Sequence, residues 1–404
     1  MNEIFSPIRY CKNSEDFITL IKEWKEFGKK TAEDKIEGIT RYTNEFWTSK
    51  QRQGHSIHEV SYRACFKPQL PNFFINTLTK EGDMVYDPFM GRGTTLIEAA
   101  LLKRNAIGND INPLSKALVK SRLNTPTLNE IQERLSIITF DYSLSINYKE
   151  LLAFYDKKTL QEIEQLRLYF LDKSEENLDK IDRWIRMVAI NRLTGHSKGF
   201  FSVYTLPPNQ AVTAERQLKI NKQRKQEPEY RDIKNLILRK SKSLLRSGGV
   251  EKPKKIGLYT SESYSTKEID NESIHLTVTS PPFLDVVDYK ADNWLRCWFL
   301  DIDSDKVNIS QLKDIDEWSA FIEQTLHELD RITKKNGHLA FEVGEVRGNI
   351  ELEKYVIQAS KTTNFTPILV MINAQNFTKT SAAWGIDNNK KGTNTNRIVV
   401  FKKN

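Results

Sequence analysis

A glycine-rich segment, Asp87-Pro-Phe-Met-Gly-Arg-Gly-Thr-Thr95, has residue types and a spacing suited to holding a ligand. Gly91 and Gly93 can adopt positive φ angles, which lets the backbone approach a ligand closely. The segment lies between a strand-like run at 83–87 and a helix-like run at 94–103. Unpaired N–H groups at a helix N-terminus attract carboxylates and phosphates. The sequence therefore predicts a ligand-binding turn here, against the plain alternative of a tight turn without a ligand.

Asp110 indicates what kind of ligand this turn would bind. It stands nineteen residues after Gly91, at the end of a strand-like run at 105–110. A carboxylate in that position can accept hydrogen bonds from both hydroxyls of a ribose. The third glycine of the dinucleotide-binding fingerprint is missing, and so is the Gly-Lys-Thr/Ser of a P-loop. We therefore expect a nucleoside that carries a ribose and a carboxylate, and not a pyrophosphate.

A second segment, Thr279-Ser-Pro-Pro-Phe283, directly follows another strand-like run. Pro281 and Pro282 fix φ and lack N–H groups, so this stretch presents carbonyl oxygens. The Ser280 hydroxyl and the Pro281 carbonyl can accept the two hydrogens of an amino group, and Phe283 can stack on a flat ring. Because α/β folds place ligands at the carboxyl ends of strands, the segment predicts a site for a planar ring that bears an amino group. The alternative is a rigid loop.

Alternating strand-like and helix-like runs surround both segments. Strand, turn, helix and strand between 83 and 110 form a βαβ unit, which implies a parallel sheet. A second block begins near residue 255 and contains a clear helical pattern at 316–331. The predicted fold is a Rossmann-like, doubly wound α/β sheet. We expect about seven strands, those outside the first unit being at 256–260, 273–279, 338–343, 368–372 and 397–401.

Three regions of the chain follow from these patterns. Residues 61–123 and 254–404 make up the predicted sheet domain. Residues 124–253 contain amphipathic helical patterns and are too long for a loop, so they predict a mainly helical insertion. Residues 1–60 are expected to form an N-terminal helical extension, with helices near 14–29 and 32–47.

Cationic side chains are concentrated in the insertion. The stretch 216–255 contains 14 Lys and Arg against 4 Asp and Glu, in a chain of 404 residues with a net charge of +8. This excess favours an anionic partner such as nucleic acid, and a solvated helical face is the simpler alternative. The candidate DNA-binding residues are Arg216, Lys219, Lys222, Arg224, Lys225 and, in a glycine-containing turn, His196.

Composition excludes several classes of protein. No apolar run is long enough to cross a bilayer. The N-terminus lacks the apolar core of a signal peptide, so we expect a cytoplasmic protein without a membrane partner. Cys11, Cys65 and Cys297 are too scattered for a disulfide framework or a zinc site, and no metal is expected.

The segments at 87–95 and 279–283 resemble motifs I and IV of the AdoMet-dependent methyltransferases that act on exocyclic amines, whose motif IV is (D/N/S)PP(Y/F). The stretch from 58 to 74, which includes Phe66 and Pro71, resembles motif X more loosely. The order X, I, insertion, IV is similar to the α arrangement of these enzymes, in which the recognition region lies between the two halves. Here the insertion precedes the expected third strand, which departs from that arrangement.

The resemblance implies AdoMet as the cofactor and a base flipped out of double-stranded DNA as the substrate. It implies that Asp110 binds the ribose, that Ile111 packs on the adenine, and that Phe89 lines the methionine side. A polar segment at 388–397 lies between two closing strands, where it could line the target pocket. The implied catalytic residues are Ser280, Pro281, Pro282 and Phe283. The implied cofactor-binding residues are Phe66, Pro71, Asp87, Pro88, Phe89, Gly91, Gly93, Thr94, Asp110 and Ile111.

Ser280 favours cytosine N4 as the methylated atom, because enzymes of this family with Ser at that position are mostly N4-cytosine methyltransferases. C5-cytosine chemistry needs a nucleophilic cysteine, usually after a proline, and no Pro-Cys dipeptide is present. A DNA N6-adenine methyltransferase of the same fold is the nearest alternative. An RNA base methyltransferase and a non-catalytic AdoMet-binding specificity subunit are further ones. The resemblance also allows a separately encoded restriction endonuclease as a partner.

Overall fold

The structure is a computed structural model that describes residues 9–47, 54–63, 65–206, 211–282, 289–303, 306–307, 312, 314–343, 350–374 and 395–404. Within these ranges, nine strands form one sheet in the order β1-β2-β8-β9-β7-β6-β3-β4-β5. The strands are β1 (Ala32–Ile36), β2 (Ile39–Asn44), β3 (Met84–Asp87), β4 (Asn105–Asn109), β5 (Ile256–Tyr259), β6 (Ile274–Thr279), β7 (Thr333–Val343), β8 (Phe365–Ala374) and β9 (Thr395–Lys403).

The sheet is doubly wound, which confirms the predicted α/β fold. From β3 the chain continues outward through β4 and β5, all parallel, and then returns to the other side of β3 to form β6 and β7, also parallel. β9 runs antiparallel between β7 and β8. The order of the strands therefore reverses between β3 and β6, and the carboxyl ends of strands at such a switch point are where α/β proteins bind ligands.

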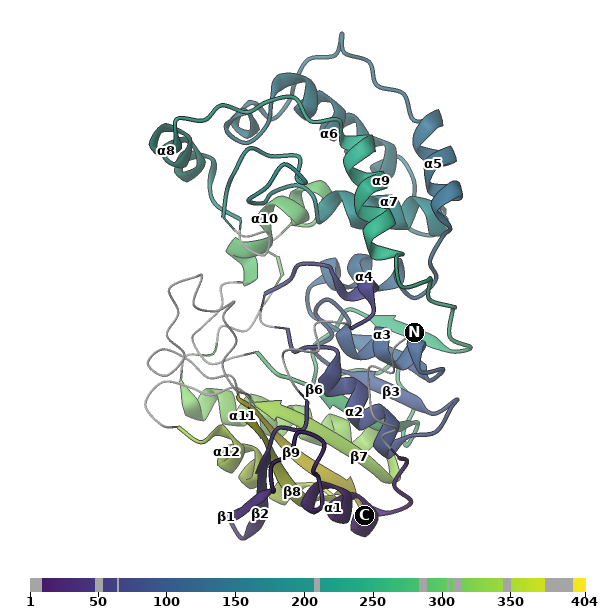
Figure 1. The fold of residues 1–404 in the computed structure, drawn as a ribbon, viewed down its shortest axis with the longest axis vertical. Helices are drawn as coiled ribbons and strands as arrows, with labels where there is room; N and C mark the ends of the chain where they lie inside the picture. The colour runs from purple at the N-terminus through teal and green to yellow at the C-terminus, as the bar shows by residue number, and fades with distance from the viewer. Residues whose placement is uncertain are drawn as a thin grey trace.

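Helices cover both faces of the sheet (Figure 1). One face packs against α1 (Ser14–Lys22), α2 (Gln69–Leu78), α3 (Thr94–Leu101) and α4 (Pro113–Lys120). The other packs against α11 (Ile315–Ile332) and α12 (Leu352–Ala359). Side chains of β7 alternate between these layers, Ala340 toward the first and Leu339 and Phe341 toward the second, as the two-residue period of a strand requires. In the described part of the chain, no helix is both long and apolar enough to cross a membrane.

The N-terminal region differs from its prediction. The helix expected at 32–47 is wrong: β1 and β2 form an antiparallel hairpin there, and β2 extends the sheet by pairing with β8. Glu37 and Gly38 both have positive φ, 48° and 80°, as tight hairpin turns require. The β-branched and aromatic residues of β2, from Ile39 to Thr43, favour a strand. Only α1 of the expected helical extension is helical within residues 9–47.

The insertion is helical, and one later helix joins it. Its helices are α5 (Leu128–Ile137), α6 (Lys157–Leu171), α7 (Lys180–Ile190), α8 (Ala214–Arg224) and α9 (Ile233–Leu244), with the short helix η2 (Lys149–Ala153). The later one is α10 (Tyr289–Phe299), which lies among them in Figure 1. Trp294 of α10 donates from Nε1 to the Val212 carbonyl at 3.2 Å, and Arg167 of α6 donates from Nε to the Trp298 carbonyl at 2.8 Å. The helical subdomain therefore includes α10, outside the predicted boundaries of 124–253.

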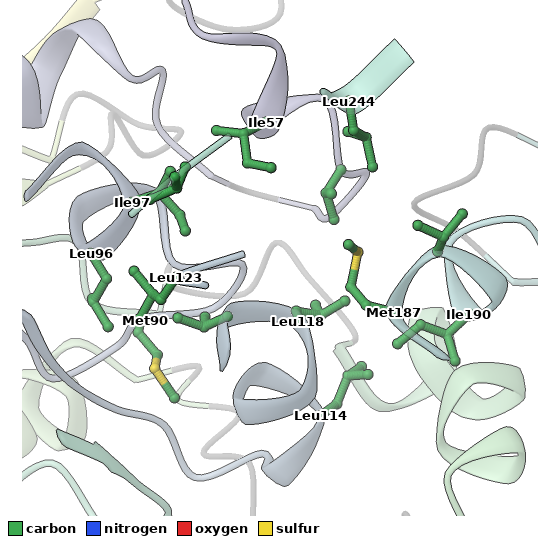
Figure 2. Packing of buried hydrophobic residues seen from close by; sticks show 14 of the residues in the cluster. Ile57, Met90, Leu96, Ile97, Leu114, Leu118, Leu123, Met187, Ile190 and Leu244 are labelled. Carbon is green, nitrogen blue, oxygen red and sulfur yellow. The ribbon is translucent and has the colours of Figure 1, made fainter. Parts of the chain in front are cut away.

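The helical subdomain shares a hydrophobic core with the sheet domain. Figure 2 shows Leu114 and Leu118 of α4 facing Met187 and Ile190 of α7, with Leu244 of α9 nearby. All five side chains are almost fully buried. Because the two parts are joined by packed side chains as well as by the chain, the subdomain is held in a defined place beside the carboxyl ends of the strands.

Candidate active site at the switch point of the sheet

The glycine-rich turn joins β3 to α3, as predicted, and its two glycines have positive φ. The values are 48° for Gly91 and 75° for Gly93. A Cβ atom on Gly93 would lie 2.4 Å from Cγ2 of the buried Val119 on α4. Position 93 therefore requires glycine for both its backbone conformation and its packing.

Asp110 follows β4 and is oriented by the turn it faces. One carboxylate oxygen accepts the Gly91 N–H at 2.8 Å, and the other accepts the Asn112 N–H at 2.9 Å. Burial raises the pKa of Asp110, and these two hydrogen bonds oppose the rise. Each oxygen of a carboxylate can accept two hydrogen bonds, so acceptor positions remain for a ligand.

Asp87 connects the two sequence segments. It ends β3, is 2% exposed, and accepts hydrogen bonds from Thr279 Oγ1 at 2.7 Å and from the Phe89 N–H at 3.1 Å. Burial raises its pKa to about 7. The hydrogen bonds oppose that rise, and the charge of Asp110 adds to it. Since Thr279 ends β6, this carboxyl group ties the two central strands together where they reach the site.

The Ser-Pro-Pro segment lies against the same turn. The Ser280 hydroxyl oxygen is buried and makes no hydrogen bond of normal geometry with any described residue. Trp318 of α11, 1% exposed, donates from Nε1 to the Pro282 carbonyl at 3.2 Å and so fixes the segment. Phe283 lies outside the described residues.

One cavity brings the predicted residues together. Of the predicted site residues, Pro88, Phe89, Gly91, Asp110, Ile111, Ser280, Pro281 and Pro282 line it. Asp87, Gly93 and Thr94 lie behind this wall, where they shape the turn. Pro71 is buried within α2, and Phe66 is half-buried; neither lines the cavity.

Several lining residues were not predicted. They are Tyr62, Arg63, Cys65, Asn112, Glu262, Ser263 and Phe321. Glu262 and Ser263 closely follow the carboxyl end of β5, a position that could have marked them from the sequence. Phe321 comes from the middle of α11, where it is one of many apolar residues on an amphipathic helix. Only the packing of α11 against the sheet brings it to the cavity.

Arg92, between the two glycines, holds the segment at 58–66 against the turn. Its guanidinium group donates to the carbonyls of Val60 at 3.1 Å, Phe66 at 3.3 Å and His58 at 3.4 Å. This segment carries Tyr62, which lines the cavity. Arg92 therefore assembles one wall of the cavity from a part of the chain that precedes β3.

The predicted DNA-binding residues are all exposed on the helical subdomain. His196, Lys222 and Lys225 line one open groove, together with Lys198 and Arg231; Glu227 and Glu229 also line it, so cations outnumber acids there. The other candidates do not line it: Arg216 and Lys219 are on α8, and Arg224 stacks over the Tyr204 ring at 3.7 Å.

Comparisons with known proteins agree with this geometry. Residues 4–121 match the DNA methylase family N6_N4_Mtase. The Type II methyltransferase M.MvaI of Kocuria varians is 25% identical over 70% of this chain and 65% of its own length. M.MthZI of Methanothermobacter thermautotrophicus is 29% identical over 41% of this chain and 50% of its own length. M.BsoBI of Geobacillus stearothermophilus is 22% identical over 83% of this chain and 70% of its own length. The chain thus spans less than two thirds of M.MvaI and M.MthZI. By the family match over residues 4–121 and by these relatives, the chain is similar to the amino-methyltransferases of the N4/N6 family.

Proposed function

We propose that this chain is a site-specific DNA methyltransferase, which transfers the methyl group of AdoMet to N4 of a cytosine flipped out of duplex DNA. One observation supports this most directly. Asp110 and the Ser280-Pro281 pair, from strands on opposite sides of β3, line one cavity at the switch point. A nucleoside cofactor and an amino-bearing base can meet there.

The cavity fits AdoMet in the donors and acceptors that it offers. Asp110 keeps acceptor positions for the ribose hydroxyls, because each of its oxygens accepts only one backbone N–H. Ile111 and Phe89 offer apolar surface, and Gly91, which has positive φ, places no side chain on the cavity wall. When bound, AdoMet would supply a methyl group already activated by the positive sulfur.

The Ser-Pro-Pro segment would hold the base. Trp318 occupies the Pro282 carbonyl, which leaves the Ser280 hydroxyl and the Pro281 carbonyl as acceptors for the two amino hydrogens. Hydrogen bonds to both would draw the nitrogen lone pair out of conjugation with the ring and toward the methyl group. Alignment of this kind can contribute up to roughly 7–11 kcal/mol to catalysis. The base must leave the stack to reach the site, and its partner surface would be the basic groove of the helical subdomain.

The choice of cytosine N4 rests on Ser280 at the first position of the segment. The relatives are Type II methyltransferases, a designation that does not specify the base. Adenine N6 is an exocyclic amine with the same two hydrogens, so the same fold and mechanism would serve it.

The test is expression in a methylation-deficient bacterial host, followed by single-molecule sequencing of genomic DNA and mass spectrometry of its nucleosides. We expect N4-methylcytosine in one short sequence context, and its loss in Ser280→Ala. Ser273→Ala is the matched control, since this serine bonds the Asp270 carbonyl just before the far end of β6. N6-methyladenine would overturn the base assignment. A wild-type protein that leaves the DNA unmodified would contradict the proposed activity.

A further inference from the structure

Glu342 is a buried carboxylate beside the candidate base-holding segment that the reaction above does not use. It lies near the carboxyl end of β7, is 5% exposed, and accepts a hydrogen bond from Asn396 Nδ2 of β9 at 3.0 Å. Within the described ranges no lysine or arginine is within ion-pair distance of it. Burying a carboxylate without a cation is costly, so its position calls for a functional reason.

The register of the sheet places Glu342 next to Ser280. β6 and β7 are parallel, with Val278 opposite Ala340 and Thr279 opposite Phe341. Continuing this register by one residue puts Ser280 opposite Glu342, and paired residues on neighbouring strands point to the same face. Ser280 is also close enough to lower the pKa of Glu342, which burial raises.

A serine hydroxyl that holds an amino group must act as an acceptor, and this requires a place for its own hydrogen. The oxygen has two lone pairs and one hydrogen, which rotates to suit its surroundings. Pro281 and Pro282 follow it, and the Ser280 oxygen has no hydrogen-bond partner among the described residues. If the hydroxyl hydrogen pointed at the base, it would meet the amino hydrogens and repel them. A nearby carboxylate is the acceptor that would draw it away.

We propose that Glu342 is a positioning residue: it accepts the Ser280 hydroxyl hydrogen, so that the Ser280 lone pairs face the amino group of the target base. Asn396 holds the carboxylate in place. The side chains of Ser280, Glu342 and Asn396 then form one hydrogen-bonded row along the ends of β6, β7 and β9. The proposal rests on the proposed function, since it assigns the orientation of the group that binds the base.

A double-mutant cycle tests it. The variants are Ser280→Ala, Glu342→Gln and the pair, with unmethylated genomic DNA from the deficient host as substrate and methyl incorporation measured in a single turnover. We expect Glu342→Gln to slow methyl transfer by about 10- to 100-fold, because the amide can donate where the carboxylate only accepts. Adding Glu342→Gln to Ser280→Ala should not slow methyl transfer further, because the Ser280 hydroxyl that Glu342 orients is then absent.

Two further readouts separate this role from a structural one. AdoMet binding by calorimetry should change by less than about twofold in Glu342→Gln, because the carboxylate does not line the cavity. Glu353→Gln is the contrasting control: Glu353 is fully buried on α12 and accepts a 2.7 Å hydrogen bond from Arg397. Its loss should lower the melting temperature and leave the rate per folded molecule unchanged.

Three results would overturn the proposal. They are a wild-type rate of methyl transfer in Glu342→Gln, rate losses of the two single variants that multiply in the double variant, or a loss of AdoMet affinity in Glu342→Gln as large as its loss of rate. If Glu342→Gln does not fold, Asn396→Ala replaces it in the cycle, and it should likewise slow the wild type and leave Ser280→Ala unaffected. Failure of the proposed function would look different, because the wild-type protein itself would then incorporate no methyl groups into DNA.

Discussion

The cavity at the switch point and the basic groove of the helical subdomain are built on opposite principles. At the cavity, Asp110 in the wall and Asp87 behind it accept hydrogen bonds at defined distances, and Trp318 fixes Pro282. In the groove, Lys222 and Lys225 are exposed. Under the proposed function, the cavity would bind its ligands through the placement of single atoms, and the groove would bind DNA through the number of its charges.

This difference predicts how each region responds to substitution. A group that fixes the geometry of a site acts alone, so removing it has a large and specific effect. Cations that bind phosphates act additively and are screened by salt. Substitutions in both regions test this contrast, from the largest expected effect to the smallest.

Asp110→Ala should weaken AdoMet binding by about 10- to 100-fold, because hydrogen bonds to a charged group contribute roughly 1.5–3 kcal/mol. Calorimetry measures the Kd directly. Glu81→Ala is the matched control, an exposed acid near the opposite end of β3. An unchanged Kd in Asp110→Ala would show that the cavity does not bind the cofactor through this carboxylate.

The raised pKa of Asp87, about 7, predicts a pH effect on stability. Between its unfolded pKa near 4 and about 7, the folded protein keeps a proton that the unfolded chain has lost. The free energy of unfolding therefore falls with rising pH through this window, by at most about 1.4 kcal/mol per unit, and levels off above it. The Asp87→Asn variant has no titrating carboxyl group at this position, so its free energy of unfolding lacks this pH dependence.

Urea unfolding of both proteins between pH 5 and 8 isolates this effect. The stability of Asp87→Asn relative to the wild type should increase up to about pH 7 and then stay constant. A difference that does not vary with pH would show that Asp87 is already ionised in the folded protein, and that the cavity is more polar than its geometry indicates.

Gly93→Ala should destabilise the protein by about 1–3 kcal/mol more than Gly82→Ala, because the added methyl group meets Val119. Gly82 has a similar positive φ, 85°, and no atom within 4 Å of an added Cβ. Both variants therefore have backbone strain from a similar positive φ, and only Gly93→Ala is overpacked. Equal melting temperatures would mean that α4 moves away at little cost.

Replacing Lys222 and Lys225 together by alanine should reduce DNA affinity several-fold and leave AdoMet binding unchanged. The slope of log K against log salt should become shallower by about 0.9 for each phosphate that is no longer neutralised. Lys29→Ala with Lys30→Ala removes the same charge from an exposed segment of the N-terminal region. If both pairs have the same effect, the groove is not a DNA surface and only the net charge matters.

The sequence by itself determined the local elements of the sheet domain. Runs of β-branched residues such as those in β6 are strands because their neighbours in sequence already favour that conformation. The same holds for the glycine-rich turn between β3 and α3, since positive φ at two nearby positions needs glycine. These signals come from a few consecutive residues, which is why they could be read without the structure.

Contacts between distant residues were decided only by the tertiary structure. The β-branched and aromatic residues of β2 favour a strand in place of the helix expected at 32–47, but only the structure shows that this strand pairs with β8. The strand register carries Glu342 to Ser280, and the packing of α11 carries Phe321 to the cavity. Strand pairing and helix packing depend on hydrogen bonds and buried surface contributed by distant segments of the chain. No local pattern contains that information.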